Sequence, residues 1–149
     1  QGMVGDIVAP DLRAKHDMLV VATNTYSFGT PAGMFSAAET QHGIHGGDKE
    51  TSVVLALRPD LVDMGKARNF RSSAERLVAE TRHLSINARA KVGWQIQDLN
   101  PAGACGDASA ATAQKGQAVL DHIATQFIEM LRDLDNTSPQ WLDQQPVLA

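Results

Sequence analysis

The 149-residue sequence predicts an α/β fold. A short apolar run at residues 18–22 has the β-branched content of a strand buried on both faces, as in a parallel sheet with a layer of helices on each side. Apolar residues at three- and four-residue spacing predict a long amphipathic helix over 108–135. Helical segments on both sides of a buried strand are typical of α/β architectures.

The N-terminal half is expected to contain two helices. Residues 3–15 have apolar side chains at near-helical spacing, and Pro10 is expected to kink or divide this helix because proline cannot donate a backbone hydrogen bond. Residues 48–58 carry a second apolar stripe, which ends just before Pro59. The residue before a proline disfavours helical geometry, so the second helix is expected to stop there.

The C-terminal half predicts a helix over 72–82, a short strand over 92–96 and a turn at 100–103. For the last helix, Asp107 or Ser109 is expected to be the N-cap, because short polar side chains accept hydrogen bonds from the free backbone N–H groups of the first turn.

Composition limits the possible roles. The length suits one domain over 1–149, with residues 136–149 as a loosely packed tail. A net charge of −4 with scattered Lys and Arg argues against nucleic acid or an anionic membrane as a partner. No apolar run approaches the roughly 20 residues that span a bilayer. Cys105 is the only cysteine, which suggests a reducing cytoplasm, and it is either a buried small residue or a nucleophile.

The densest polar cluster lies at residues 41–52 and contains His42, His45 and Glu50. Imidazole and carboxylate groups are ligands that suit zinc or manganese, and glycines around His45 let the backbone approach a ligand. A solvated loop with Glu50 in the first turn of a helix explains the same residues. A mononuclear zinc site of His42, His45 and Glu50 is a further alternative, and it predicts that His42→Ala abolishes metal binding.

Several motifs in the same order resemble those of the creatininase (creatinine amidohydrolase) family. The resemblance extends from about Leu19 to Leu134. The matching residues are His45-Gly46-Gly47, Glu50-Thr51-Ser52, Arg58-Pro59-Asp60-Leu61-Val62, Gly93-Trp94, Asp98-Leu99-Asn100-Pro101, the run from Gly106 to Ala113, and Lys115-Gly116. The resemblance implies part of a three-layer α/β/α fold with a mostly parallel sheet.

The resemblance also implies a reaction. Family members hydrolyse a cyclic or formyl amide in a small molecule with a water bound between two divalent metal ions, zinc or manganese. On this basis Glu50 is expected to bind one metal ion and His45 to supply the proton for the leaving nitrogen. His42 and Tyr26 fall where relatives contact substrate. Relatives form ring-like assemblies, which implies a homo-oligomer.

The family's other metal ligands belong to a segment expected before Gln1: a Glu-x-His pair, an Asp and an Asn-Gly-His segment. None of these motifs is in this chain. The chain therefore resembles a C-terminal portion of the family's domain, and we expect it to be inactive alone and to bind divalent metal weakly. The alternative is a non-catalytic structural or interaction module that retains the fold. A Glu-x-His and an Asn-Gly-His encoded upstream would favour the enzyme.

Overall fold

The computed structural model describes residues 2–87 and 90–138, which divide into two compact units. One unit combines residues 1–29 with 122–149, and the other comprises residues 30–121. Within the described residues, no helix has the length and apolar character needed to cross a membrane. The single-domain expectation for 1–149 stays a prediction.

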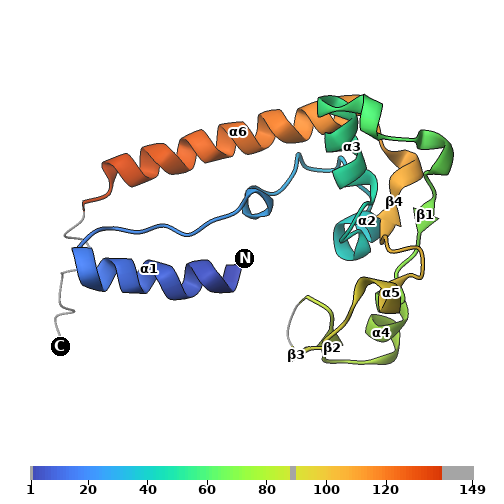
Figure 1. The fold of residues 1–149 in the computed structure, drawn as a ribbon, viewed down its shortest axis with the longest axis horizontal. Coiled ribbons are helices and arrows are strands. Elements are labelled where there is room, and N and C mark those ends of the chain that lie inside the picture. Colours follow the sequence, from blue (N-terminus) through green and yellow to red (C-terminus); the bar gives the residue numbers. More distant parts are fainter. Residues whose placement is uncertain (1, 88–89, 139–149) are drawn as a thin grey trace. The chain divides into compact units, whose positions relative to one another are not determined.

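The described residues form six α-helices connected by short strands and turns (Figure 1). The helices are α1 (Gly2–His16), α2 (Ala37–His42), α3 (Asp48–Leu57), α4 (Ala74–Glu80), α5 (Ile96–Leu99) and α6 (Ala113–Asn136). Single 3-10 turns occupy Thr25–Phe28, Pro59–Leu61, Met64–Lys66 and Ala108–Ala110. The two helices expected over 48–58 and 72–82 are thus confirmed as α3 and α4.

The strands are two residues each and form two separate pairs. β1 (Asn69–Phe70) is antiparallel to β4 (Gly106–Asp107), with Phe70 opposite Gly106. β2 (Leu84–Ser85) is parallel to β3 (Ala90–Lys91). The α/β class is confirmed, whereas the expected mostly parallel sheet is not found among the described residues.

Two predicted strands were wrong. Residues 18–22 have no strand conformation, because a strand needs a hydrogen-bonded neighbour and none of the described residues pairs with this segment. In the other case, residues 92–95 are irregular and Ile96 begins α5, where Gln95 and Asp98 form a reciprocal capping box. The capping residues turn this segment into a helix start instead of a strand.

Pro10 does not divide the first helix. α1 continues from Gly2 to His16 with the proline inside it. Two ion pairs support its last turns, each between residues one helical turn apart: Lys15 with Asp11 and Arg13 with Asp17, both at 2.7 Å. Asp17 then takes a positive φ of 51°, which ends the helix.

α6 begins later than expected. The segment from Ala108 to Ala110 is a separate 3-10 turn whose N-cap is Asp107, so the expected helix start was wrong. The α-helix starts at Ala113, and the hydroxyl of Thr112 accepts the backbone N–H of Lys115 at 3.2 Å, which is N-cap geometry. Asp107 thus caps the short turn, not the long helix.

The core of the second unit lies beside the loop that joins α2 to α3. Its buried members come from four different segments: Ala74, Ile86, Leu99 and Cys105. Ile44, in that loop, packs against them. On α6, Val119 is 1% exposed, whereas Phe127 and Leu131 of its apolar stripe are 42% and 44% exposed. The described core is thus concentrated next to the polar cluster.

Candidate functional site

His45 lies in the loop between α2 and α3, and its backbone is held on one side by Cys105. The two residues form an isolated antiparallel bridge. The N–H of His45 donates to the carbonyl of Cys105 at 3.2 Å, and the N–H of Cys105 donates back at 2.7 Å. Because Cys105 is fully buried in the core, the bridge anchors the histidine backbone to a packed part of the unit.

Gly46 is held by two side chains from the first turn of α3. Its N–H donates to Oε2 of Glu50 at 2.6 Å, and its carbonyl accepts from the hydroxyl of Thr51 at 3.2 Å. Gly46 has a φ of +64°, a conformation that glycine adopts without steric cost. Glu50 therefore fixes the peptide group that directly follows His45, and Thr51 fixes the next one, between Gly46 and Gly47.

Ser52, the third residue of the Glu50-Thr51-Ser52 motif, connects α3 to the start of α6. Ser52 is fully buried, and its hydroxyl donates to Oδ1 of Asp48 at 3.1 Å and accepts the N–H of Thr112 at 3.0 Å. The other oxygen of Asp48 lies 2.6 Å from Nζ of Lys115, which also donates to the carbonyl of Ala110. A buried ion pair is favourable when hydrogen bonds satisfy its remaining atoms, and this one meets that condition.

His45 and Glu50 are brought together by these contacts. Nδ1 of His45 lies 3.6 Å from Oε2 of Glu50. The imidazole side chain is 61% exposed and the carboxylate 33%. The pair is therefore open to a ligand on one side, while the backbone on both sides of the histidine is fixed.

Glu39, which sequence reasoning missed, is the buried carboxylate beneath this loop. It is 3% exposed, and it accepts the N–H of Lys49 at 3.2 Å and the N–H of Asp107 at 2.9 Å. The signal available in the sequence was Ser36 followed by Glu39, the spacing of a capping box. Ser36 does cap α2 through the N–H of Glu39, but the carboxylate of Glu39 binds two other segments.

His42 lies in a different environment from His45. It lines a polar cavity of about 350 Å³ together with Glu39, Arg71 and Glu75, and His45 is not among the described residues of this lining. A hydrogen bond from Arg71 lowers the pKa of Glu75, and His42 lowers it further to a smaller extent. The structure therefore separates the two histidines into a loop site and a neighbouring polar cavity.

The sequence also singled out Tyr26 as a substrate contact and Cys105 as either a buried residue or a nucleophile. Tyr26 is 67% exposed in the 3-10 turn Thr25–Phe28, which belongs to the unit that does not contain His45. Cys105 is buried, and burial raises the pKa of its thiol while a hydrogen bond from Ser72 opposes the rise. Because the thiolate is the reactive form, this environment suits a core residue and not a nucleophile.

The described His, Cys, Asp and Glu side chains do not by themselves fit a metal ion. Among residues 2–87 and 90–138, no group of three or more His, Cys, Asp or Glu side chains is arranged to hold one. His45 and Glu50 give one imidazole and one carboxylate. Because zinc sites in proteins use three or four protein ligands, the described residues do not complete a metal site by themselves.

Comparisons with solved structures show the creatininase fold. A structure from Bacteroides fragilis NCTC 9343, provisionally assigned as a creatinine amidohydrolase, matches with a TM-score of 0.65 and 21% identity over 87% of this chain and 49% of its own. A creatinine amidohydrolase (creatininase) matches with a TM-score of 0.56 and 22% identity over 89% and 50%. A manganese form of creatininase matches at 0.54 and 22% over 86% and 48%. This chain thus spans about half the length of the structures it matches.

Sequence comparison gives the family directly. No curated protein matches the chain. The family described as creatininase, creatinine amidohydrolase, matches residues 1–131, most of the 149. That span includes the His45 loop, the Glu50-Thr51-Ser52 motif and the polar residues that connect α3 to α6. The chain therefore belongs to the creatininase (creatinine amidohydrolase) family.

Proposed function

We propose that this chain is part of a metal-dependent amidohydrolase in which His45 delivers a proton to the leaving nitrogen of an amide. The observation that carries the proposal is the arrangement of His45, with its backbone bonded to Cys105, its ring exposed and its Nδ1 facing Glu50. An amide nitrogen leaves poorly unless it is protonated, and histidine is the side chain most often used as a general acid.

Glu50 is proposed to set the orientation of the imidazole as well as to ligate a metal ion. A carboxylate on the Nδ1 side favours a proton on Nδ1, which leaves Nε2 for exchange with the substrate. The same carboxylate holds the N–H of Gly46. If Glu50 binds the metal ion and also holds Gly46, it would keep His45, the proton donor, at a constant distance from the reacting amide.

The proposed substrate is a small molecule with a cyclic or formyl amide. His42 supports this size class because the polar cavity that it lines, about 350 Å³, suits a small ligand. Tyr26 is proposed as a second substrate contact. A homo-oligomer and a cytoplasmic location stay predictions.

Two divalent metal ions, zinc or manganese, are the proposed cofactors of the whole enzyme. Support comes from fold relatives described as a manganese creatininase and as a Zn-Zn type of a creatininase variant. Such ions would activate water and polarise the amide carbonyl. Because the described residues do not complete a site, we propose that other ligands lie outside them and that the 149-residue chain alone is inactive.

The test compares the 149-residue chain with the product of the complete reading frame that encodes it. Calorimetric titration with Zn²⁺ or Mn²⁺ should give weak binding to the 149-residue chain. The complete product, loaded with either ion, should hydrolyse creatinine or an N-formyl amide. Substitution His45→Gln should lower its kcat by about 10²–10⁴-fold, the usual contribution of a general acid.

His83→Gln is the matched control, since His83 is an exposed histidine elsewhere in the second unit and should leave kcat unchanged. A tight stoichiometric metal site in the 149-residue chain would contradict its proposed inactivity. A complete product that binds no metal and hydrolyses no amide would favour a non-catalytic module.

A further inference from the structure

Glu39 is a buried carboxylate that has no ion-pair partner among residues 2–87 and 90–138. Its two oxygens accept backbone N–H groups from two different segments. Lys49, one donor, lies in the first turn of α3, where free N–H groups and the helix dipole stabilise a negative charge. Asp107, the other donor, lies in β4. A buried charge that is held only by backbone donors fixes the segments that supply them.

The space around this carboxylate is shaped by three glycines. A Cβ placed on Gly43 would lie 2.3 Å from Cδ of Glu39, one on Gly47 2.4 Å from Oε1, and one on Gly106 2.6 Å from Oε2. Real side chains do not approach so closely, so the carboxylate occupies room that only glycine leaves. These glycines belong to the end of α2, the start of α3 and β4, which are the segments around the His45 loop.

Both donors lie next to a contact that holds His45. Lys49 immediately precedes Glu50, whose carboxylate faces the imidazole. Asp107 is two residues after Cys105, whose backbone is bridged to His45. Glu39 therefore connects the segment that orients the ring to the segment that anchors the backbone.

We propose that Glu39 is a positioning residue that sets the distance between the start of α3 and β4, and so places His45 against Glu50. The carboxylate spans the two segments from beneath the loop. Without it, the N-terminus of α3 and β4 could separate, and the imidazole would lose its fixed position relative to Glu50. The geometric inference stands by itself, and only its effect on catalysis rests on the proposed function.

Nuclear magnetic resonance of the ¹⁵N-labelled 149-residue chain tests the proposal. Glu39→Gln keeps the shape of the side chain but places an NH₂ group opposite a backbone N–H, so one hydrogen bond is lost. The reporters are the amide of Gly46, which is bonded to Glu50, and the ring nitrogens of His45. We expect the Gly46 amide proton to move upfield, its exchange protection to fall by about tenfold or more, and the ¹⁵N shifts of His45 to change.

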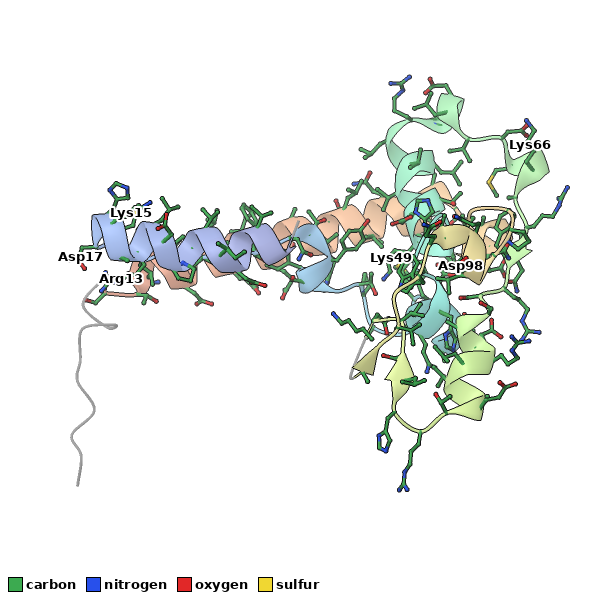
Figure 2. All side chains as sticks on the ribbon, turned by 60° about the horizontal axis from the view of Figure 1, so that its bottom comes forward. Arg13, Lys15, Asp17, Lys49, Lys66 and Asp98 are labelled. Carbon is green, nitrogen blue, oxygen red and sulfur yellow. The ribbon has the colours of Figure 1, made fainter. Side chains whose placement is uncertain are left out.

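Asp98→Asn is the control, because Asp98 is a carboxylate of the same unit that caps a different helix. The carboxylate of Asp98 accepts the N–H of Gln95, the N-cap of α5, at 2.8 Å. Lys49, the donor to Glu39, lies in α3 instead (Figure 2). This substitution removes the same charge and should leave the Gly46 and His45 signals unchanged. If Glu39→Gln affects only the Lys49 and Asp107 amides, Glu39 is a local cap and the proposal is overturned.

A measurement on the unmodified chain covers the case in which Glu39→Gln fails to fold. The amides of Gly46, Lys49 and Asp107 should exchange with one common free energy of opening, because Glu39 holds their segments as a unit. Independent opening of Gly46 relative to the other two amides would overturn the proposal.

Discussion

Oε2 of Glu50 lies 3.6 Å from Nδ1 of His45 and accepts the N–H of Gly46 at 2.6 Å, so one oxygen serves both the histidine ring and the peptide group that follows it. The hydrogen bond from Gly46 restrains the Glu50 side chain and so holds its carboxylate beside the exposed imidazole. Glu50 contributes both a hydrogen-bond acceptor and a negative charge, and two different substitutions of Glu50 can distinguish these contributions.

We expect Glu50→Ala to lower the free energy of unfolding by about 1.5–3 kcal/mol, the value of a hydrogen bond to a charged group. Glu50→Gln should cost less than about 1 kcal/mol, because the amide oxygen can still accept the N–H of Gly46 and only the charge near the helix N-terminus is lost. Urea unfolding of both variants measures the difference. Equal costs would show that charge, and not the hydrogen bond, is the main contribution of Glu50.

The ion pair between Lys115 and Asp48 gives a second prediction. Lys115→Met leaves the carboxylate of Asp48, whose side chain is 5% exposed, without its cation. The expected loss is about 3 kcal/mol, at the lower end for a broken buried pair because Lys115 is 28% exposed. Lys66→Met is the control, since Lys66 is 85% exposed and pairs with Asp63 at the surface. Its free energy of unfolding, measured with urea, should stay within about 1 kcal/mol of the wild type.

Local patterns were sufficient to predict α3 and α4. The proline after Arg58 and the apolar spacing of 48–58 depend only on neighbouring residues, and both agree with the structure. The strand at 18–22 could not be judged in this way, since strand formation depends on a distant partner that composition does not reveal. The local pattern was also misleading for the strand predicted over 92–96, because the side chains of Gln95 and Asp98 form a capping box that starts α5.

The candidate site was predicted in part. The sequence singled out His45 and Glu50 in one polar cluster, and the structure places Nδ1 of His45 3.6 Å from Oε2 of Glu50. Their roles stay predictions. Glu39 was missed because its acceptor role depends on Lys49, 10 residues away, and Asp107, 68 residues away. A sequence pattern that indicates local capping gives no information on which distant N–H groups a buried carboxylate will bind.

Acid should destabilise the chain partly through Glu75. The hydrogen bond from Arg71 lowers the pKa of Glu75 below its ordinary 4.5 in the folded protein. As the pH falls, the unfolded chain therefore takes up this proton first, and the stability that the pair provides above about pH 4.5 is lost on further acidification. Glu75→Gln removes this contribution, so its urea midpoint should fall less steeply below that pH than the wild type's. Arg71→Met should reduce the steepness in the same way, and an unchanged slope in both variants would contradict the assignment.

Gly116 of α6 packs directly against the backbone of α3. A Cβ at this position would lie 1.9 Å from the carbonyl oxygen of Ser52, which is backbone and cannot rotate away. Helix propensity alone favours Gly116→Ala by about 1 kcal/mol. The clash opposes this gain, and overpacking of this kind costs about 1–3 kcal/mol, so we expect a net loss of stability in urea unfolding. Gly93→Ala is the matched control, because no heavy atom lies within 4 Å of its Cβ position, and it should be neutral or stabilising by up to about 1 kcal/mol. A Gly116→Ala variant more stable than the wild type would mean that the two helices can move apart without loss, which is incompatible with a tight contact between Gly116 and the carbonyl of Ser52.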